Sequence, residues 1–122
     1  MSIVPNRRND LVSLIGKTVV LTGASRGIGK ELAEMLARLY ANLVLVARSA
    51  DDLNDLAAYL NEEYGTQVLV IAIDLSELNA PKTVICRTIQ RFRSFDVLIN
   101  NAGIEMHGEF VDQTPAELHK IT

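Results

Sequence analysis

Three glycines follow a short apolar run near the start of the chain, and a helical pattern begins among them. The apolar run is Thr18–Leu21, and the glycines are Gly23, Gly27 and Gly29. Glycine can turn the chain sharply at a strand end, bring main chain close to a ligand, or let a helix pack tightly on a strand. The order of these elements therefore predicts a strand–turn–helix unit whose turn faces a ligand.

The chemistry of this turn suits a phosphate group. Main-chain N–H groups that open a helix carry partial positive charge, so those near Gly27 and Ile28 would face phosphate oxygens. No Gly-Lys-Ser/Thr sequence follows, which excludes a P-loop. The alternative is a glycine-rich turn that binds nothing. We predict that a dinucleotide diphosphate binds at Gly23, Ser25, Arg26, Gly27, Ile28 and Gly29.

Further apolar runs alternate with helical patterns along the chain. The runs Leu43–Val46, Val68–Ile73 and Val97–Ile99 consist almost entirely of Val, Ile and Leu, as in strands that are covered on both faces. Helical patterns cover approximately residues 27–39, 50–63 and 81–92. Alternation of strands and helices predicts an α/β fold of parallel βαβ units with right-handed crossovers.

Apolar spacing also predicts which helix faces pack on the sheet. In the first helix these residues are Ile28, Leu32, Met35, Leu36 and Leu39. In the third helix they are Val84, Ile85, Thr88, Ile89 and Phe92. For the second helix we expect Ser49 to be the N-cap, with Asp51 and Asp52 at the positive helix end.

Composition restricts the partners. The 122 residues suit one small domain, and the net charge of −3 gives no general attraction to nucleic acids or anionic membranes. A bound phosphate must therefore be held by local geometry.

The single cysteine, Cys86, excludes an intrachain disulfide. It is expected to be a packed side chain, and its presence fits a reducing compartment. With no apolar run long enough to cross a bilayer and no signal-peptide pattern, we expect a cytoplasmic protein.

An arginine stands where NAD-binding folds usually carry an acidic residue. In these folds an Asp or Glu about 20 residues after the glycine turn binds the ribose 2′-hydroxyl of NAD. Here Arg48 follows the second strand, and Arg26 lies in the turn. A guanidinium group can pair with a 2′-phosphate through two parallel hydrogen bonds. We predict a preference for NADP(H) over NAD(H); two solvated surface arginines are the alternative.

Polar and small residues follow the third and fourth strands. Asp74 can accept a hydrogen bond from an adenine amino group, with Leu75 beside it, or it can cap the following turn. After the fourth strand, Asn101 can bridge neighbouring strand ends, while Ala102 and Gly103 leave room for a ribose. The alternative there is an ordinary Asx turn. These positions all follow carboxyl ends of strands, where open α/β sheets bind ligands.

Together these motifs resemble the short-chain dehydrogenase/reductase family. Thr22–Gly29 matches its Thr-Gly-x-x-x-Gly-x-Gly turn, Asp74-Leu75 is similar to its adenine-contacting pair, and Asn100–Gly103 matches its Asn-Asn-Ala-Gly motif. The resemblance covers about Gly16 to Thr122. It implies a partial Rossmann-like, doubly wound parallel sheet with strand order 3-2-1-4 and later strands absent. It also implies NAD(P) binding, and hydride transfer between the cofactor and a carbonyl or alcohol. Arg26 and Arg48 resemble the subset that prefers NADP.

The family's catalytic residues have no counterpart in this sequence. The family uses Asn, Ser and a Tyr-x-x-x-Lys pair, in which Tyr is the general acid and base. None of Tyr40, Tyr59 and Tyr64 is followed four residues later by Lys. We therefore expect no catalytic residue in this chain. We also expect no metal site, because His107 and His119 have no second ligand at metal spacing.

The two ends of the sequence set our expectations on domain organisation. Residues 1–15 are interpreted as an extension, and residues 16–122 as an NAD(P)-binding half-domain cut off in a helix that begins at Thr114-Pro115. We expect part of a longer NADP-dependent oxidoreductase, incompetent by itself. The alternatives are a stand-alone nucleotide-binding regulator and, less favoured, a homodimer that shares sites. An exposed edge strand or the C-terminal helix would favour self-association.

Overall fold

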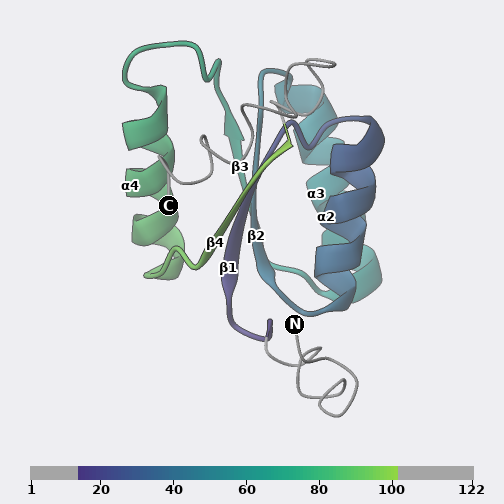
Figure 1. Ribbon diagram of the computed structural model, residues 1–122. Coiled ribbons are helices and arrows are strands. Elements are labelled where there is room, and N and C mark those ends of the chain that lie inside the picture. The colour runs from purple at the N-terminus through teal and green to yellow at the C-terminus, as the bar shows by residue number, and fades with distance from the viewer. Residues whose placement is uncertain (1–13, 102–122) are drawn as a thin grey trace, which may run out of the picture.

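Strands and helices alternate along residues 14–101, the part of the chain that the computed structural model describes (Figure 1). The elements are β1 (Thr18–Thr22), α2 (Gly27–Arg38), β2 (Asn42–Ala47), α3 (Ala50–Tyr64), β3 (Val68–Ala72), α4 (Ala80–Phe92) and β4 (Val97–Asn100). Every strand and helix that the sequence predicts in this range is present, with ends that differ by one residue at most. The predicted extension up to residue 13 and the helix at Thr114-Pro115 lie outside the described residues.

The strands form one parallel sheet in the order β3-β2-β1-β4. Val20 in the middle of β1 pairs with Val44 of β2 and Leu98 of β4, and Val44 pairs in turn with Leu69 of β3. The α/β class and the strand order 3-2-1-4 are therefore confirmed. Because all strands are parallel, their carboxyl ends meet at one edge of the sheet.

Each face of the sheet has its own helices, as Figure 1 shows, with α2 and α3 on one side and α4 on the other. Alternate residues of β1 divide between them: Val19 and Leu21 pack beneath α2 and α3, while Val20 packs in the cluster that includes Val84 of α4. This alternation follows from the two-residue period of a strand. Burial on both faces explains why the strand sequences are apolar without interruption.

Helix α2 contacts the sheet through small residues. Its buried positions are Gly29, Ala33 and Ala37, spaced four residues apart. Leu32 and Leu36 flank this line and are partly buried against the core, as predicted. Ile28 and Met35 are 56% and 53% exposed, so their predicted inward orientation is wrong. The reason is that small side chains allow close approach of the helix axis, which turns neighbouring large residues toward solvent.

Helix α4 shows the same kind of deviation. Ala80, Val84 and Thr88 are its buried residues, and the Thr88 hydroxyl donates to the Val84 carbonyl oxygen at 2.7 Å. Phe92 packs against the core cluster as predicted. Ile85 and Ile89, which were also expected to face inward, are exposed. Cys86, which was expected to be packed, is exposed as well.

No helix among the described residues is long and apolar enough to cross a membrane.

A hydrogen-bonded group joins β1 and β4 at the amino ends of the strands. The Thr18 N–H donates to the Asp96 carboxylate at 2.8 Å, and the Asp96 N–H donates to the Thr18 carbonyl at 3.0 Å. The hydroxyls of Thr18 and Ser94 lie 2.8 Å apart. Thr18 is fully buried, so its N–H depends on Asp96 for a partner.

Replacing Asp96 tests this contact. Asp96→Ala leaves the Thr18 N–H without its acceptor, and we expect the free energy of unfolding to fall by about 1–3 kcal/mol. Asp96→Asn keeps an acceptor oxygen and should lose less. Urea denaturation of the three proteins measures the difference. Equal stability of Asp96→Ala and the wild type would contradict the role given to this carboxylate.

Candidate functional site

A cavity of about 970 Å³ opens at the carboxyl edge of the sheet. Gly23 follows β1, Arg48 follows β2, and Asp74 follows β3, so three parallel strands deliver these residues to one place. Its lining consists of Gly23, Ser25, Arg26, Val46, Ala47, Arg48, Ser49, Ile73, Asp74, Leu75 and Ser76. This size is within the range of small-molecule sites in proteins.

The glycine turn forms one wall of the cavity. Gly23 and Gly27 have φ angles of +66° and +54°, which residues with a side chain adopt only with strain. A Cβ atom on Gly29 would collide with the carbonyl oxygen of Gly23 and the side-chain amide of Asn101. Gly29 is therefore needed for the close approach of α2 to the end of β1, whereas Gly23 and Gly27 set the path of the turn.

The first turn of α2 has no protein side chain as a cap within the described part of the chain. Its N-cap residue, Arg26, has extended backbone and makes no side-chain capping bond, and the first turn contains no acidic residue. Helix α3 differs, because the hydroxyl of Ser49 accepts a hydrogen bond from the Asp52 N–H at 3.4 Å, as the sequence predicted. The positive end of α2 is thus left to interact with solvent or an anion.

Two arginines bring positive charge to the cavity. Arg26 comes from the glycine turn and Arg48 from the end of β2, and the side chains of both are exposed. Ile28 is exposed, and Gly27, Ile28 and Gly29 are not among the residues that line the cavity. With a net charge of −3 on the whole sequence, this local pair is what makes the cavity attractive to an anion.

Asp74 caps the turn that follows β3. One of its carboxylate oxygens accepts hydrogen bonds from the N–H and the hydroxyl of Ser76, at 2.9 and 2.7 Å. These bonds, the main-chain one foremost, lower the pKa of Asp74, and the positive charge of Arg48 lowers it further. The carboxylate is consequently ionised at neutral pH, and the bonds from Ser76 both end on one of its two oxygens. The turn-capping alternative considered for Asp74 is what the structure shows, in a residue that also lines the cavity.

Asparagines at the end of β4 tie this strand to the glycine turn. The side-chain amide of Asn101 donates to the Gly23 carbonyl oxygen at 3.0 Å, and the Thr22 hydroxyl donates to the Asn100 side-chain oxygen at 2.9 Å. Asn101 is fully buried and does not line the cavity. It bridges strand ends, as the sequence suggested, and it does so by holding the turn.

Several residues that line the cavity are not among those predicted from the sequence. Ser49 and Ser76 contribute hydroxyl groups, while Val46, Ala47 and Ile73 contribute apolar surface. Each lies within two positions of a predicted residue at a strand end, which is the signal that could have identified it. Ala102, Gly103, His107 and His119 lie outside the described residues. Within residues 14–101 no group of three or more His, Cys, Asp and Glu side chains could hold a metal ion.

Comparisons with known proteins agree on one family. The sequence model of the family described as short chain dehydrogenase matches residues 17–122. Among curated proteins, the L-rhamnose 1-dehydrogenase (NAD(P)(+)) of Azotobacter vinelandii is 38% identical over 112 residues, which is 89% of this chain and 43% of that protein.

Two solved structures have the same arrangement of elements. The L-sorbose reductase of Gluconobacter frateurii, complexed with NADPH and L-sorbose, is 38% identical with a TM-score of 0.67, and the match covers 70% of this chain and 32% of that one. The alcohol dehydrogenase of Thermococcus sibiricus, complexed with 5-hydroxy-NADP, is 39% identical with a TM-score of 0.65, covering 67% and 35%. The chain spans less than half the length of each of these proteins.

Gly29→Ala tests the packing that forms the glycine turn. The added methyl group meets main-chain and amide atoms that cannot move independently, and we expect a loss of about 1–3 kcal/mol of stability. Lys30→Ala, at the next and exposed position of α2, should stay within about 0.5 kcal/mol of the wild type. Thermal and urea denaturation give both values. A Gly29→Ala protein as stable as Lys30→Ala would refute the contact.

Proposed function

The chain belongs to the short-chain dehydrogenase family, and on that premise we propose that its cavity binds NADP(H) as part of an oxidoreductase. The observation that carries the proposal is the uncapped first turn of α2, which opens beside two exposed arginines. A helix N-terminus of this kind suits a diphosphate. The guanidinium groups of Arg26 and Arg48 suit an additional phosphate.

Each part of the dinucleotide has matching residues. We propose that the main chain of Gly23, Ser25, Arg26, Gly27 and Ile28 holds the diphosphate, with Gly29 allowing the turn to form. Arg26 and Arg48 would hold the 2′-phosphate, and their presence supports a preference for NADP(H) over NAD(H). The ionised Asp74 would accept from the adenine amino group, beside Leu75. Asn101 would act on the cofactor through the glycine turn that it holds, and Ala102 and Gly103 would leave room for a ribose.

Activity and substrate belong to the whole protein. When bound, the nicotinamide cofactor supplies or accepts a hydride, and we propose a carbonyl or alcohol as the other reactant. The residues of this chain hold and orient the cofactor. The sequence has no Tyr-x-x-x-Lys pair to move the substrate proton, so we propose that residues 16–122 act as a cofactor-binding unit that is catalytically incompetent alone.

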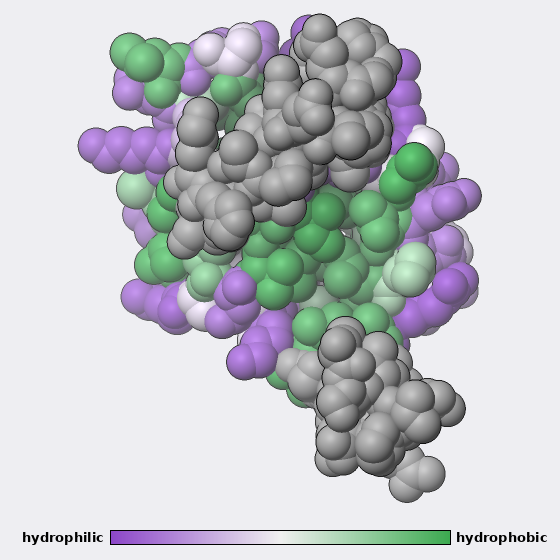
Figure 2. All heavy atoms as spheres, in the orientation of Figure 1, coloured by the Kyte–Doolittle hydropathy of each residue, from purple (hydrophilic) through white to green (hydrophobic). Residues whose placement is uncertain are grey.

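The sheet edge at β4 supports a proposal of self-association. Figure 2 shows apolar residues gathered at the centre of the face that carries β4, between α4 and α2. Val97 of β4 is 36% exposed, and Ile85 and Ile89 of α4 are 38% and 42% exposed. An edge strand flanked by apolar side chains favours pairing between chains.

We also propose a cytoplasmic location, because Cys86 is an exposed free thiol and such thiols persist in reducing compartments. Cell fractionation can test this location.

Calorimetric titration of NADPH and NADH tests cofactor binding. We expect NADPH to bind more tightly to the wild type. Arg48→Ala should weaken NADPH by about 10- to 100-fold, because a charge-assisted contact to the 2′-phosphate is lost, and leave NADH unchanged. Arg87→Ala, which removes the same charge from the exposed side of α4, is the matched control. Equal loss for both cofactors, or tighter NADH binding by the wild type, would overturn the NADP preference.

Sedimentation over a range of concentrations tests self-association. We expect the wild type to form larger species as its concentration rises, and Val97→Lys to shift the equilibrium to monomer because a charge is costly in a paired edge. Leu78→Lys is the control, since Leu78 is 93% exposed and follows β3 at the opposite edge of the sheet. A wild type that stays monomeric at every concentration would contradict the proposal.

A further inference from the structure

Helices α2 and α3 both begin at the cavity and lie side by side on one face of the sheet (Figure 1). Arg26, the N-cap of α2, and Ser49, the N-cap of α3, both line the cavity. The spacing between the two helix starts therefore sets the spacing between the glycine turn and the Arg48–Ser49 segment. Contacts that hold α3 in place relative to α2 therefore also determine the shape of the proposed NADP(H) site.

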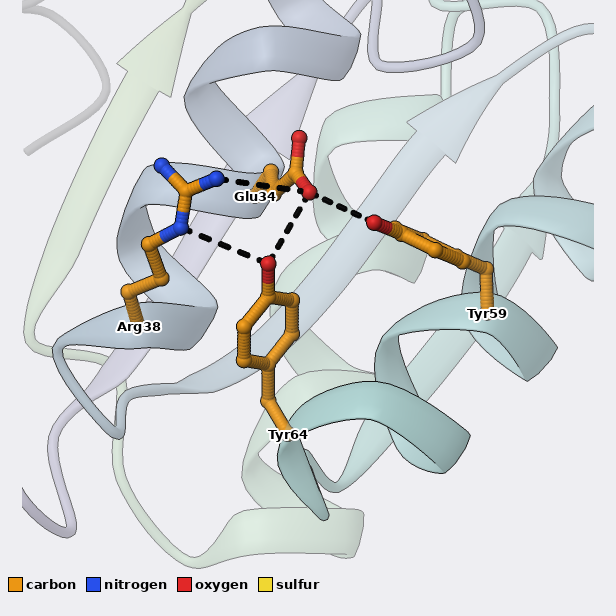
Figure 3. Close-up of polar contacts among 4 residues, drawn as sticks. All are labelled: Glu34, Arg38, Tyr59 and Tyr64. Carbon is orange, nitrogen blue, oxygen red and sulfur yellow. Dashed lines mark hydrogen bonds and ion pairs between the residues drawn. The ribbon is translucent and has the colours of Figure 1, made fainter.

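Four polar side chains connect these two helices nearer their C-terminal ends (Figure 3). Glu34 of α2 accepts hydrogen bonds from the hydroxyls of Tyr59 and Tyr64 of α3, at 2.7 and 2.9 Å, with a single carboxylate oxygen. Arg38 of α2 donates to the Tyr64 hydroxyl at 3.3 Å and lies 3.5 Å from the Glu34 carboxylate. We call these four residues the tyrosine network.

The hydrogen bonds of the tyrosine network keep Glu34 ionised and Tyr59 protonated. Hydrogen bonds from Tyr59 first, then from Tyr64, lower the pKa of Glu34, and the charge of Arg38 lowers it further. The bond to Glu34 in turn raises the pKa of Tyr59, so that this phenol stays a donor. Hydrogen bonds to an ionised acceptor are the strong kind. Glu34 is the common acceptor, and removing it takes away the bond that each tyrosine donates to it, so that only the 3.3 Å bond from Arg38 to Tyr64 is left between the two helices in this network.

The other contacts of α3 have little directional character. Leu53, Leu56 and Leu60 pack it on the sheet, and apolar contacts of this kind permit small tilts. In the described part of the chain, the side-chain hydrogen bonds between α2 and α3 all belong to the tyrosine network. Helix α2 is itself fixed at its start, where Gly29 meets the Gly23 carbonyl.

We propose that Glu34 is a positioning residue that, through Tyr59 and Tyr64, sets the distance between the starts of α2 and α3 and hence the fit of the 2′-phosphate. The proposal rests on the NADP(H) function given above. Helix α3 is about 22 Å long at 1.5 Å per residue, so a tilt of about 5° at one end moves the other by about 2 Å. A shift of that size separates Arg48 from Arg26 but leaves the glycine turn intact. NADPH binding is affected more than NADH binding.

Cofactor titration of Glu34 variants is the first test. Glu34→Ala should weaken NADPH by about 3- to 10-fold while NADH changes less, so the ratio of the two affinities falls. Glu34→Gln keeps an acceptor oxygen and should restore most of the ratio, and Tyr59→Phe, which loses one donor, should be intermediate. Glu31→Ala removes a carboxylate from the same helix nearer the cavity and should leave the ratio unchanged. A lower melting temperature with an unchanged ratio in Glu34→Ala and Tyr59→Phe would overturn the proposal.

A distance measurement that needs no cofactor separates this proposal from the proposed function. Spin labels at Glu31→Cys and Asp51→Cys, in a Cys86→Ser background, report the separation of the N-terminal halves of α2 and α3, where both residues are exposed. We expect the distance distribution to shift or broaden with Glu34→Ala or Tyr59→Phe and to remain close to the parent with Glu34→Gln. An unchanged distribution in both disruptive variants refutes the positioning role, whatever the titrations show. Absence of NADPH binding by the wild type, with a changed distribution, refutes the function instead.

Discussion

The close contact between the first turn of α2 and the end of β1 determines most of the structure described here. Gly29 lies against the Gly23 carbonyl oxygen, and Asn101, the residue after β4, donates to that same oxygen. A side chain at Gly29 has no space, so the helix can approach this closely only with glycine there. The approach directs the small residues Ala33 and Ala37 to the sheet and the uncapped helix start to the cavity.

The chemistry of the site follows from that arrangement and from very few charges. The chain is acidic overall, so it attracts an anion only where the N-terminus of a helix and guanidinium groups lie close together. Parallel strands supply the convergence, because β1, β2 and β3 each end at the cavity. Asp74 remains ionised in this setting since its oxygen accepts two bonds from Ser76, which allows an acceptor and two cations to occupy one pocket.

Sequence patterns were accurate where a residue acts on its immediate neighbours. The strands, helices and Ser49 cap depend on local spacing and were found from it. The prediction of which helix residues face the sheet was only partly correct. Ile28 and Met35 belong to the apolar side of α2 but lie outside its buried line and are exposed. Which strip of an apolar helix face is buried depends on how closely the helix approaches the sheet, and periodicity contains no information on that distance.

The sequence alone determined the order of strand, glycine turn and helix. It also determined the family to which the chain belongs and the residues at the strand ends. These features can be recognised from sequence because a phosphate-binding turn needs particular residues at adjacent positions. Tertiary structure decided what depends on distant residues. It brought Tyr59 and Tyr64 to Glu34 across 25 and 30 residues, and it added Ser49 and Ser76 to the cavity wall. Contacts between separate helices are fixed by packing on a shared sheet, which no sequence spacing specifies.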